Sequence, residues 1–195
     1  RRPLRSTLDR SSAASDVYKR QASLILLFDI EMDEIREDAA GKGKIGTTRR
    51  GIGPCYEDKV GRRSIRVMDL RSERNLDSRL KNVLSHHNAI RKGLKKKIFK
   101  KDEIKKKLLK IAPQILGFAK PVWLKLDEFK KGRKKILFEG AQGVLLDVDH
   151  GTYPFVTSSH CTVGSAILNG VPPICIRDVW GVAKIYETYV GSKIL

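Results

Sequence analysis

The sequence predicts an α/β fold with a central, mostly parallel sheet and flanking helices. Short apolar runs alternate with helical stretches along the chain, which is the pattern of such folds. The run Ser23–Phe28 has the length of a buried strand, and the acidic segment that follows it indicates a helix closed by Gly41. Lys134–Glu139 predicts a second strand, which ends in a Gly-Ala-Gln-Gly turn, and residues 178–195 alternate as a strand does.

Two regions outside these strands complete the predicted organisation. Residues 1–21 show no hydrophobic periodicity, so we expect a disordered or foreign leader followed by one domain over residues 22–195. Within that domain, residues 72–130 predict a lysine-rich helical region interrupted by prolines. Its first helix begins near Ser72 and carries leucines on one face, and its two adjacent histidines are expected at the surface: Leu76, Leu80, Leu84, His86, His87.

Composition limits the classes of protein to consider. The 195 residues are 41% hydrophobic, which is ordinary for a globular protein. No apolar run approaches the roughly 18 residues that a membrane-spanning helix requires, so no membrane partner is expected. Three scattered cysteines without a CxxC pair favour a reducing, cytoplasmic location and predict neither a disulfide framework nor a zinc site.

The formal charge of +18 is concentrated in one segment. Residues 91–110 hold eleven lysines and arginines against two acids, and their apolar residues recur at three- and four-residue spacings. The spacing predicts one amphipathic helix with a solvated basic face. The alternative is a nucleic-acid-binding module, but the segment offers only Phe99 for base stacking, so we consider a nucleic-acid partner the weaker hypothesis.

The first glycine-rich block, Ile45–Lys59, reads IGTTRRGIGPCYEDK. Its glycines permit positive φ and close backbone approach, while its threonines and arginines donate hydrogen bonds. Free backbone N–H groups beside hydroxyls and cations form a receptor for phosphate. The block matches neither a Walker loop nor a GxGxxG fingerprint.

The second glycine-rich block, Leu137–His160, reads LFEGAQGVLLDVDHGTYPFVTSSH. Gln142 follows a predicted strand, where its amide can both donate to and accept from a ligand, and three consecutive hydroxyl residues begin at Thr157. Asp147, Asp149 and His150 are residue types that bind metals, but we interpret them as turn and capping groups because a third committed ligand is missing. Two such blocks in one chain indicate a phosphorylated small molecule held from two sides.

The strings IGTTxRGIGPxYEDK and FEGAQGxLLDxDHGTYPxVTSS resemble those of adenylosuccinate synthetases, over residues 22 to 191. The resemblance implies a P-loop-NTPase-like α/β fold, incomplete in this fragment. It also implies a cytoplasmic, homodimeric ligase of purine biosynthesis that uses GTP to join IMP and L-aspartate and that needs Mg²⁺. The family's catalytic residues, its Mg²⁺ and GTP phosphate contacts and its guanine-reading residues have no counterpart in this chain, so we expect the fragment alone to be inactive.

Carried over by motif position, the resemblance implies an IMP half-site. Thr48 and Thr157 would contact the 5′-phosphate, and Gln142 would hydrogen-bond the hypoxanthine and support the phosphorylated intermediate. Arg62 would reach into the partner subunit's IMP site, and Val190 would line the nucleotide pocket.

Three positions depart from the family pattern. Arg49 stands where the family usually has glycine, so a loop that needs positive φ there would be strained. His160 replaces an asparagine and Tyr189 replaces an arginine, both beside expected nucleotide contacts. A remaining alternative is that the fragment does not fold by itself, because missing strands would leave sheet edges unpaired.

Overall fold

The computed structural model describes residues 18–186, and the chain folds into two compact units. Among the described residues, unit 1 consists of residues 18–24 and 58–125, and unit 2 of residues 25–57 and 126–186. In the described part of the chain, no helix combines the length and the apolarity that a membrane crossing requires.

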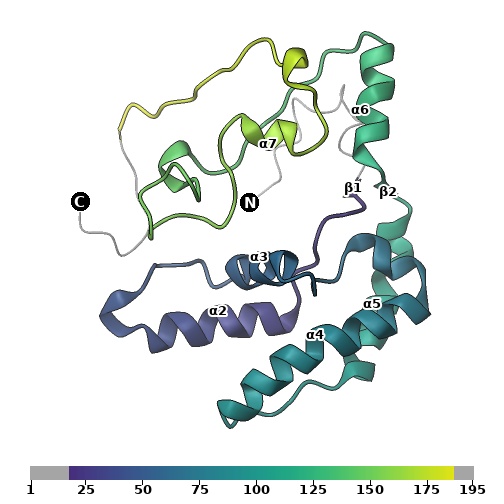
Figure 1. Ribbon diagram of the computed structural model, residues 1–195, viewed down its shortest axis with the longest axis vertical. Coiled ribbons are helices and arrows are strands. Elements are labelled where there is room, and N and C mark those ends of the chain that lie inside the picture. The colour runs from purple at the N-terminus through teal and green to yellow at the C-terminus, as the bar shows by residue number, and fades with distance from the viewer. Residues whose placement is uncertain (1–17, 187–195) are drawn as a thin grey trace. The chain divides into compact units, whose positions relative to one another are not determined.

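Unit 1 is built on two long helices, α4 (Glu73–Gly93) and α5 (Lys101–Leu116), which contact each other and a short 3-10 helix at Val67–Arg71 (Figure 1). The helix α4 begins as predicted, since the Ser72 hydroxyl accepts the N–H of Asn75 at 3.3 Å. The predicted leucine face is confirmed: Leu76, Leu80 and Leu84 are buried and form the core of the unit.

The basic segment 91–110 is not one helix, contrary to the prediction. The helix α4 ends at Gly93, residues 94–100 form a connection in which Lys95 has φ 54°, and α5 starts at Lys101. The Arg91 side chain stabilises this connection by donating to the Lys97 carbonyl at 2.5 Å. The three- and four-residue spacing of apolar residues was misleading here. Leu94 and Ile98 lie in the connection between the helices and are exposed, so they are not part of a buried helix face.

Unit 2 contains α2 (Leu27–Ala39), most of α3 (Ile52–Val60), a 3-10 turn at Gly41–Gly43 and the second glycine-rich block. The block holds a 3-10 turn at Val144–Leu146 and precedes the short helix α7 (Gly164–Ile167) and a 3-10 turn at Pro173–Cys175. The helix α6 (Val122–Lys131) crosses from unit 1 to unit 2. The acidic helix was predicted correctly, and Gly41 follows it with φ 54°.

The sheet prediction holds only in small part. The described residues contain two parallel strands of two residues each, β1 (Tyr18–Lys19) and β2 (Ala119–Lys120), and an isolated antiparallel bridge between Ser23 and Arg66. The described chain is therefore mostly helical. A strand is stable only where a neighbour pairs with its backbone, and few described segments supply one.

The two predicted strands that lie wholly inside the described residues are wrong as strands. In Ser23–Phe28, the Asp29 carboxylate accepts the N–H of Leu26 at 2.7 Å, which starts the helix α2 at Leu27. Lys134–Glu139 runs without a strand partner, and Leu137 is 89% exposed. Of the predicted strand at residues 178–195, the described part, up to residue 186, forms none, and the rest lies outside the described residues.

Candidate nucleotide site

The first glycine-rich block folds against acidic side chains of α2. The Glu37 carboxylate accepts the backbone N–H groups of Ile45 and Gly46 at 3.2 and 3.1 Å. Glu37 is buried, so its carboxylate oxygens form hydrogen bonds with these two backbone donors rather than with solvent. The N–H groups of Ile45 and Gly46 are therefore not available to a phosphate, although the glycine-rich composition predicted that they would be.

Asp33, one helical turn before Glu37, holds the rest of the loop. Its Oδ1 accepts the Thr47 hydroxyl at 2.8 Å, and its Oδ2 accepts the Gly51 N–H at 2.9 Å. The Thr47 oxygen in turn accepts the N–H of Arg49 at 3.3 Å. Thr48 thus lies between Thr47, which donates to the buried Asp33 carboxylate, and Arg49, which is linked to that carboxylate through the Thr47 hydroxyl.

Gly51 shows why the loop needs glycine at this position. Its φ is 75°, and a Cβ there would lie 2.7 Å from the Ile30 nitrogen in the backbone of α2. The loop therefore packs directly on the α2 backbone, which only a residue without a side chain permits. Arg49, by contrast, adopts φ 55° with a full side chain, which confirms the positive φ expected where the family has glycine.

The donors that remain for a ligand gather at the N-terminus of α3. Among the described residues, the backbone N–H groups of Thr48, Ile52 and Gly53 have no hydrogen-bond partner, and the Thr48 side chain is exposed. The first turn of a helix presents such N–H groups with a favourable dipole for an anion. In this block, the N–H groups that a phosphate could still use are thus those of Thr48, Ile52 and Gly53.

The second glycine-rich block is organised by Asp147, which is fully buried. One of its carboxylate oxygens accepts the N–H groups of Asp149 and His150, both at 3.0 Å, and the other accepts the N–H of Cys161 at 2.5 Å. The hydrogen bond from Cys161 is the main reason that the pKa of Asp147 falls to about 2, despite its burial. The capping interpretation of Asp147 describes this geometry.

A metal site at these acids fits poorly. Within either unit, the described residues bring one set of potential ligands together: Asp147, Asp149 and His160, with the His160 Nδ1 3.3 Å from an Asp149 oxygen. His160, rather than His150, is the histidine of that set. Both oxygens of Asp147 already accept backbone N–H groups, so the set offers a divalent cation only one uncommitted carboxylate.

Gln142 lies in the same block with an exposed side chain and φ 58°. The Cys161 thiol is 3.8 Å from its Oε1, a weak contact that leaves the amide open to a ligand. A non-glycine residue in the left-handed region is uncommon and is found often at functional sites. Arg62 has the same feature, with φ 61°, so strain marks two of the four described candidates, Thr48, Arg62, Gln142 and Thr157.

The structure brings the two blocks together in unit 2. A Cβ at Gly53 would lie 3.5 Å from the Ser158 hydroxyl oxygen, which is van der Waals distance. The neighbouring Thr157 is half-buried, and its N–H donates to the Leu146 carbonyl at 2.8 Å. The hydroxyl residues of the second block therefore lie beside the first turn of α3, where the free N–H groups of the first block are.

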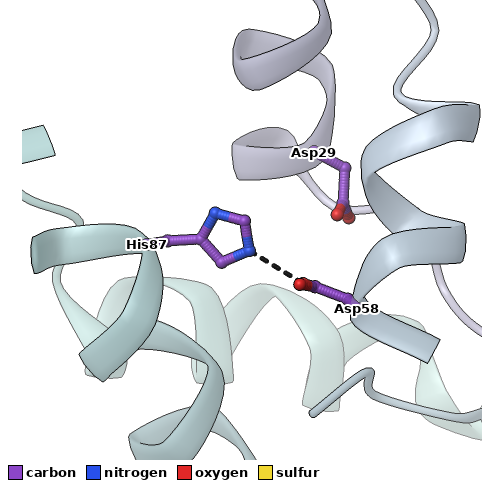
Figure 2. Close-up of side chains that lie close together, drawn as sticks. All are labelled: Asp29, Asp58 and His87. Carbon is purple, nitrogen blue, oxygen red and sulfur yellow. Dashed lines mark hydrogen bonds and ion pairs between the residues drawn. The ribbon is translucent and has the colours of Figure 1, made fainter. Parts of the chain in front are cut away.

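Arg62 lies in unit 1, on the turn that follows α3, and its side chain is exposed. Asp58 holds this turn: its backbone carbonyl accepts the N–H groups of Arg63 and Ser64, and its Oδ1 accepts Arg63 Nε at 2.6 Å. The other oxygen, Oδ2, is hydrogen-bonded to His87 Nε2 at 2.7 Å (Figure 2). Burial raises the pKa of Asp58, but His87 and Arg63 together hold that pKa below its usual value.

His87 corrects the expectation of two surface histidines. It is 3% exposed, whereas its neighbour His86 is exposed, because adjacent residues on a helix point about 100° apart. The sequence carried a signal that we did not use: His87 follows Leu76, Leu80 and Leu84 at helical spacing, on the buried face of α4.

The remaining candidates fall outside this geometry. Val190 and Tyr189 lie outside the described residues. In the basic segment, Lys101 and Lys105 form ion pairs with Asp77, and the ring of Phe99 is covered by the Arg91 guanidinium at 4.1 Å. The one aromatic residue that the nucleic-acid hypothesis required for stacking is therefore already stacked on a protein group.

Comparisons with known proteins agree with the motif strings. The family model for adenylosuccinate synthetase matches residues 12–194. Two relatives named adenylosuccinate synthetase, from Wolbachia of Brugia malayi and of Culex pipiens, are 52% and 53% identical over 169 residues, or 87% of this chain. These residues make up 39% and 40% of those relatives.

A solved structure matches as well. The fully ligated adenylosuccinate synthetase from Plasmodium falciparum superimposes with a TM-score of 0.83 at 30% identity, over 90% of this chain and 41% of that one. The chain therefore has a fold similar to that of adenylosuccinate synthetase, although the described residues contain almost no sheet. With a family model that covers most of its length, the chain belongs to the adenylosuccinate synthetase family.

Proposed function

We propose that this chain forms part of an enzyme that uses GTP to join IMP and L-aspartate, and that its own contribution is to the IMP site. The chain spans about two fifths of the relatives that it matches, so the proposed activity belongs to the longer protein. The parent enzyme is proposed to work in the cytoplasm as a homodimer.

The observation that carries the proposal is the meeting of the two blocks at Gly53 and Ser158. It joins the N–H groups of the first turn of α3 to a segment of three hydroxyl residues. A phosphate bound there would receive hydrogen bonds from Thr48 on one side and Thr157 on the other. Neither block alone offers both sets of donors.

Gln142 is proposed to read the base of the same nucleotide. An amide side chain can donate to the hypoxanthine O6 and accept from its N1–H, so it can hold the ring in one orientation. In the proposed reaction, GTP phosphorylates O6 and the aspartate amine displaces that phosphate. The N1 proton leaves as the O6–phosphate bond forms, so Gln142 accepts from N1–H only before that step and holds the reacting edge of the base afterwards through the hydrogen bond that it donates.

Two further roles concern groups outside unit 2. Arg62 is proposed to reach the IMP site of the partner subunit, which its exposed side chain and the rigid turn at Asp58 support. Val190 is proposed to line the nucleotide pocket. The family's Mg²⁺ does not fit the set of Asp147, Asp149 and His160, because both oxygens of Asp147 already accept backbone N–H groups.

The test compares IMP with inosine, which lacks the phosphate, by calorimetric titration of the full 195-residue chain. We expect Thr157→Ala to weaken IMP binding about tenfold and to leave inosine binding unchanged, because it removes one hydrogen bond to a charged group. Gln142→Ala should weaken both ligands equally.

Ser85→Ala is the matched control, since it removes an exposed hydroxyl that donates only to its own helix. Equal affinity of the unsubstituted chain for IMP and inosine would contradict the proposal. Binding that ignores IMP and falls steeply with salt would instead favour the nucleic-acid hypothesis.

A further inference from the structure

We propose that Asp33 is a positioning residue for the phosphate site: its carboxylate sets the conformation of residues 47–51 and so presents Thr48 to the ligand. The inference rests on the proposed function of Thr48. No motif string contains Asp33, because it lies on α2, fourteen residues before Thr47. Its role follows from the hydrogen bonds alone.

The direction of each hydrogen bond is dictated by the carboxylate. An ionised carboxylate only accepts, so the proton of the Thr47 hydroxyl must point to Asp33 Oδ1. The lone pairs of the Thr47 oxygen are then free to accept the N–H of Arg49. The Asp33 carboxylate thereby fixes the direction of two consecutive hydrogen bonds, from Thr47 to Asp33 and from Arg49 to Thr47, on either side of Thr48.

The same carboxylate also fixes the far end of the segment. Its second oxygen accepts the Gly51 N–H at 2.9 Å, where the backbone packs on α2 at Asp29 and Ile30. Asp33 is 6% exposed, so no water competes effectively for its oxygens. The segment 47–51 is tied at both ends to one rigid helix, which keeps Thr48 and the first turn of α3 in a constant relation.

Asp33 is not a ligand of the phosphate itself. A carboxylate would repel a phosphate, and both of its oxygens are occupied by the loop. Glu37 acts in the same way on Ile45 and Gly46. The acids of α2 therefore accept the donors that face the helix, and the N–H groups of Thr48, Ile52 and Gly53 remain for the ligand.

The decisive variant is Asp33→Asn in the full chain. An amide has one accepting oxygen and one donating nitrogen, so it can keep the Gly51 N–H only by reversing the hydrogen bond to Thr47, whose hydroxyl proton then has no fixed acceptor. We expect the ratio of IMP to inosine affinity to fall about tenfold, with inosine affinity unchanged. A purely structural role would lower both affinities together.

Glu34→Gln is the matched control, because it removes the same charge from an exposed position on the same helix. A pair of substitutions at the exposed Thr47 avoids any dependence on how well Asp33→Asn folds: Thr47→Val should lower the ratio, and Thr47→Ser should retain it.

The outcomes separate the two proposals. If the unsubstituted chain does not prefer IMP to inosine, the phosphate site itself is wrong. If it prefers IMP and both Asp33→Asn and Thr47→Val keep that preference, the site stands and the positioning role of Asp33 is overturned. A ratio that falls in these two variants but not in Glu34→Gln or Thr47→Ser supports the inference.

Discussion

Buried carboxylates hold both glycine-rich blocks, but these carboxylates come from different parts of the chain. The first is held from outside, by Asp33 and Glu37 on α2, whereas the second is held from within, by its own Asp147. In each case an acceptor-only carboxylate collects backbone N–H groups that composition alone would leave free. Glycine-rich loops are thus shaped by buried acids before any ligand arrives, and only the donors that the acids do not take can bind one.

The largest loss of stability in either block is expected from replacing a closely packed glycine with alanine. Gly51→Ala should cost about 2–5 kcal/mol, from the left-handed φ together with overpacking against α2. Gly151→Ala should cost about 1–3 kcal/mol, since a Cβ there would lie 2.5 Å from the carbonyl oxygens of Leu145 and Asp147.

Urea denaturation measures both losses in the free energy of unfolding. Gly43→Ala is the control, because a Cβ at Gly43 meets nothing within 4 Å. Equal stabilities for Gly43→Ala and Gly51→Ala would show that the first block does not pack on α2.

The second block should lose backbone hydrogen bonds when Asp147 keeps only one of its two accepting oxygens. Asp147→Asn leaves one accepting oxygen for donors that now use two, so either the N–H of Cys161 or those of Asp149 and His150 lose their partner. We expect the abandoned amides to exchange with solvent roughly tenfold faster, with the first block unaffected. Hydrogen-exchange NMR measures this, with the exposed Asp178→Asn as control. Unchanged exchange at all three amides would contradict the internal-acceptor model.

Lowering the pH should weaken the second block through protonation of Asp147. The pKa of Asp147 is lowered from 3.8 to about 2, chiefly by the N–H of Cys161, so the native state favours the ionised form. Its stabilising contribution is complete above about pH 4 and is lost as the pH falls through about 2. The amide shifts of Cys161 and His150 should titrate in this window, and the titration should be missing in Asp147→Asn. A midpoint near 4 would show that these hydrogen bonds do not stabilise the carboxylate.

The smallest effect is expected at Arg49, where the first block tolerates strain. Arg49→Gly relieves a left-handed φ, worth about 1–2 kcal/mol, but gives up an exposed ion pair with Asp38 and adds chain entropy, about 0.5–1 kcal/mol each. The net result should lie within about 1 kcal/mol of zero.

Arg50→Gly, at a position without positive φ, should instead lose about 0.5–1 kcal/mol. The comparison of these two variants by urea denaturation isolates the strain. Equal losses in both variants would mean that Arg49 carries none.

Local signals predicted the helices well and the strands poorly. Ser72 and the leucines of α4 act within a few residues of one another, so their spacing was enough. A strand at Lys134–Glu139 needs a partner that local sequence does not specify, and the described residues provide none. Likewise Asp33 was missed because its partner Gly51 lies 18 residues away. The burial of His87 could be read from its helical spacing, whereas its partner Asp58, 29 residues away, could not.

The sequence by itself determined the family, through two motif strings whose residue order is specific, and the buried leucine face of α4, through periodicity, but not the break between α4 and α5. It also predicted the strain at Arg49. The tertiary structure alone decided which donors remain for a ligand, because that depends on buried carboxylates distant in sequence from most of the groups they bind. The contact between Gly53 and Ser158 is of the same kind, since it joins segments about a hundred residues apart and no local pattern encodes it.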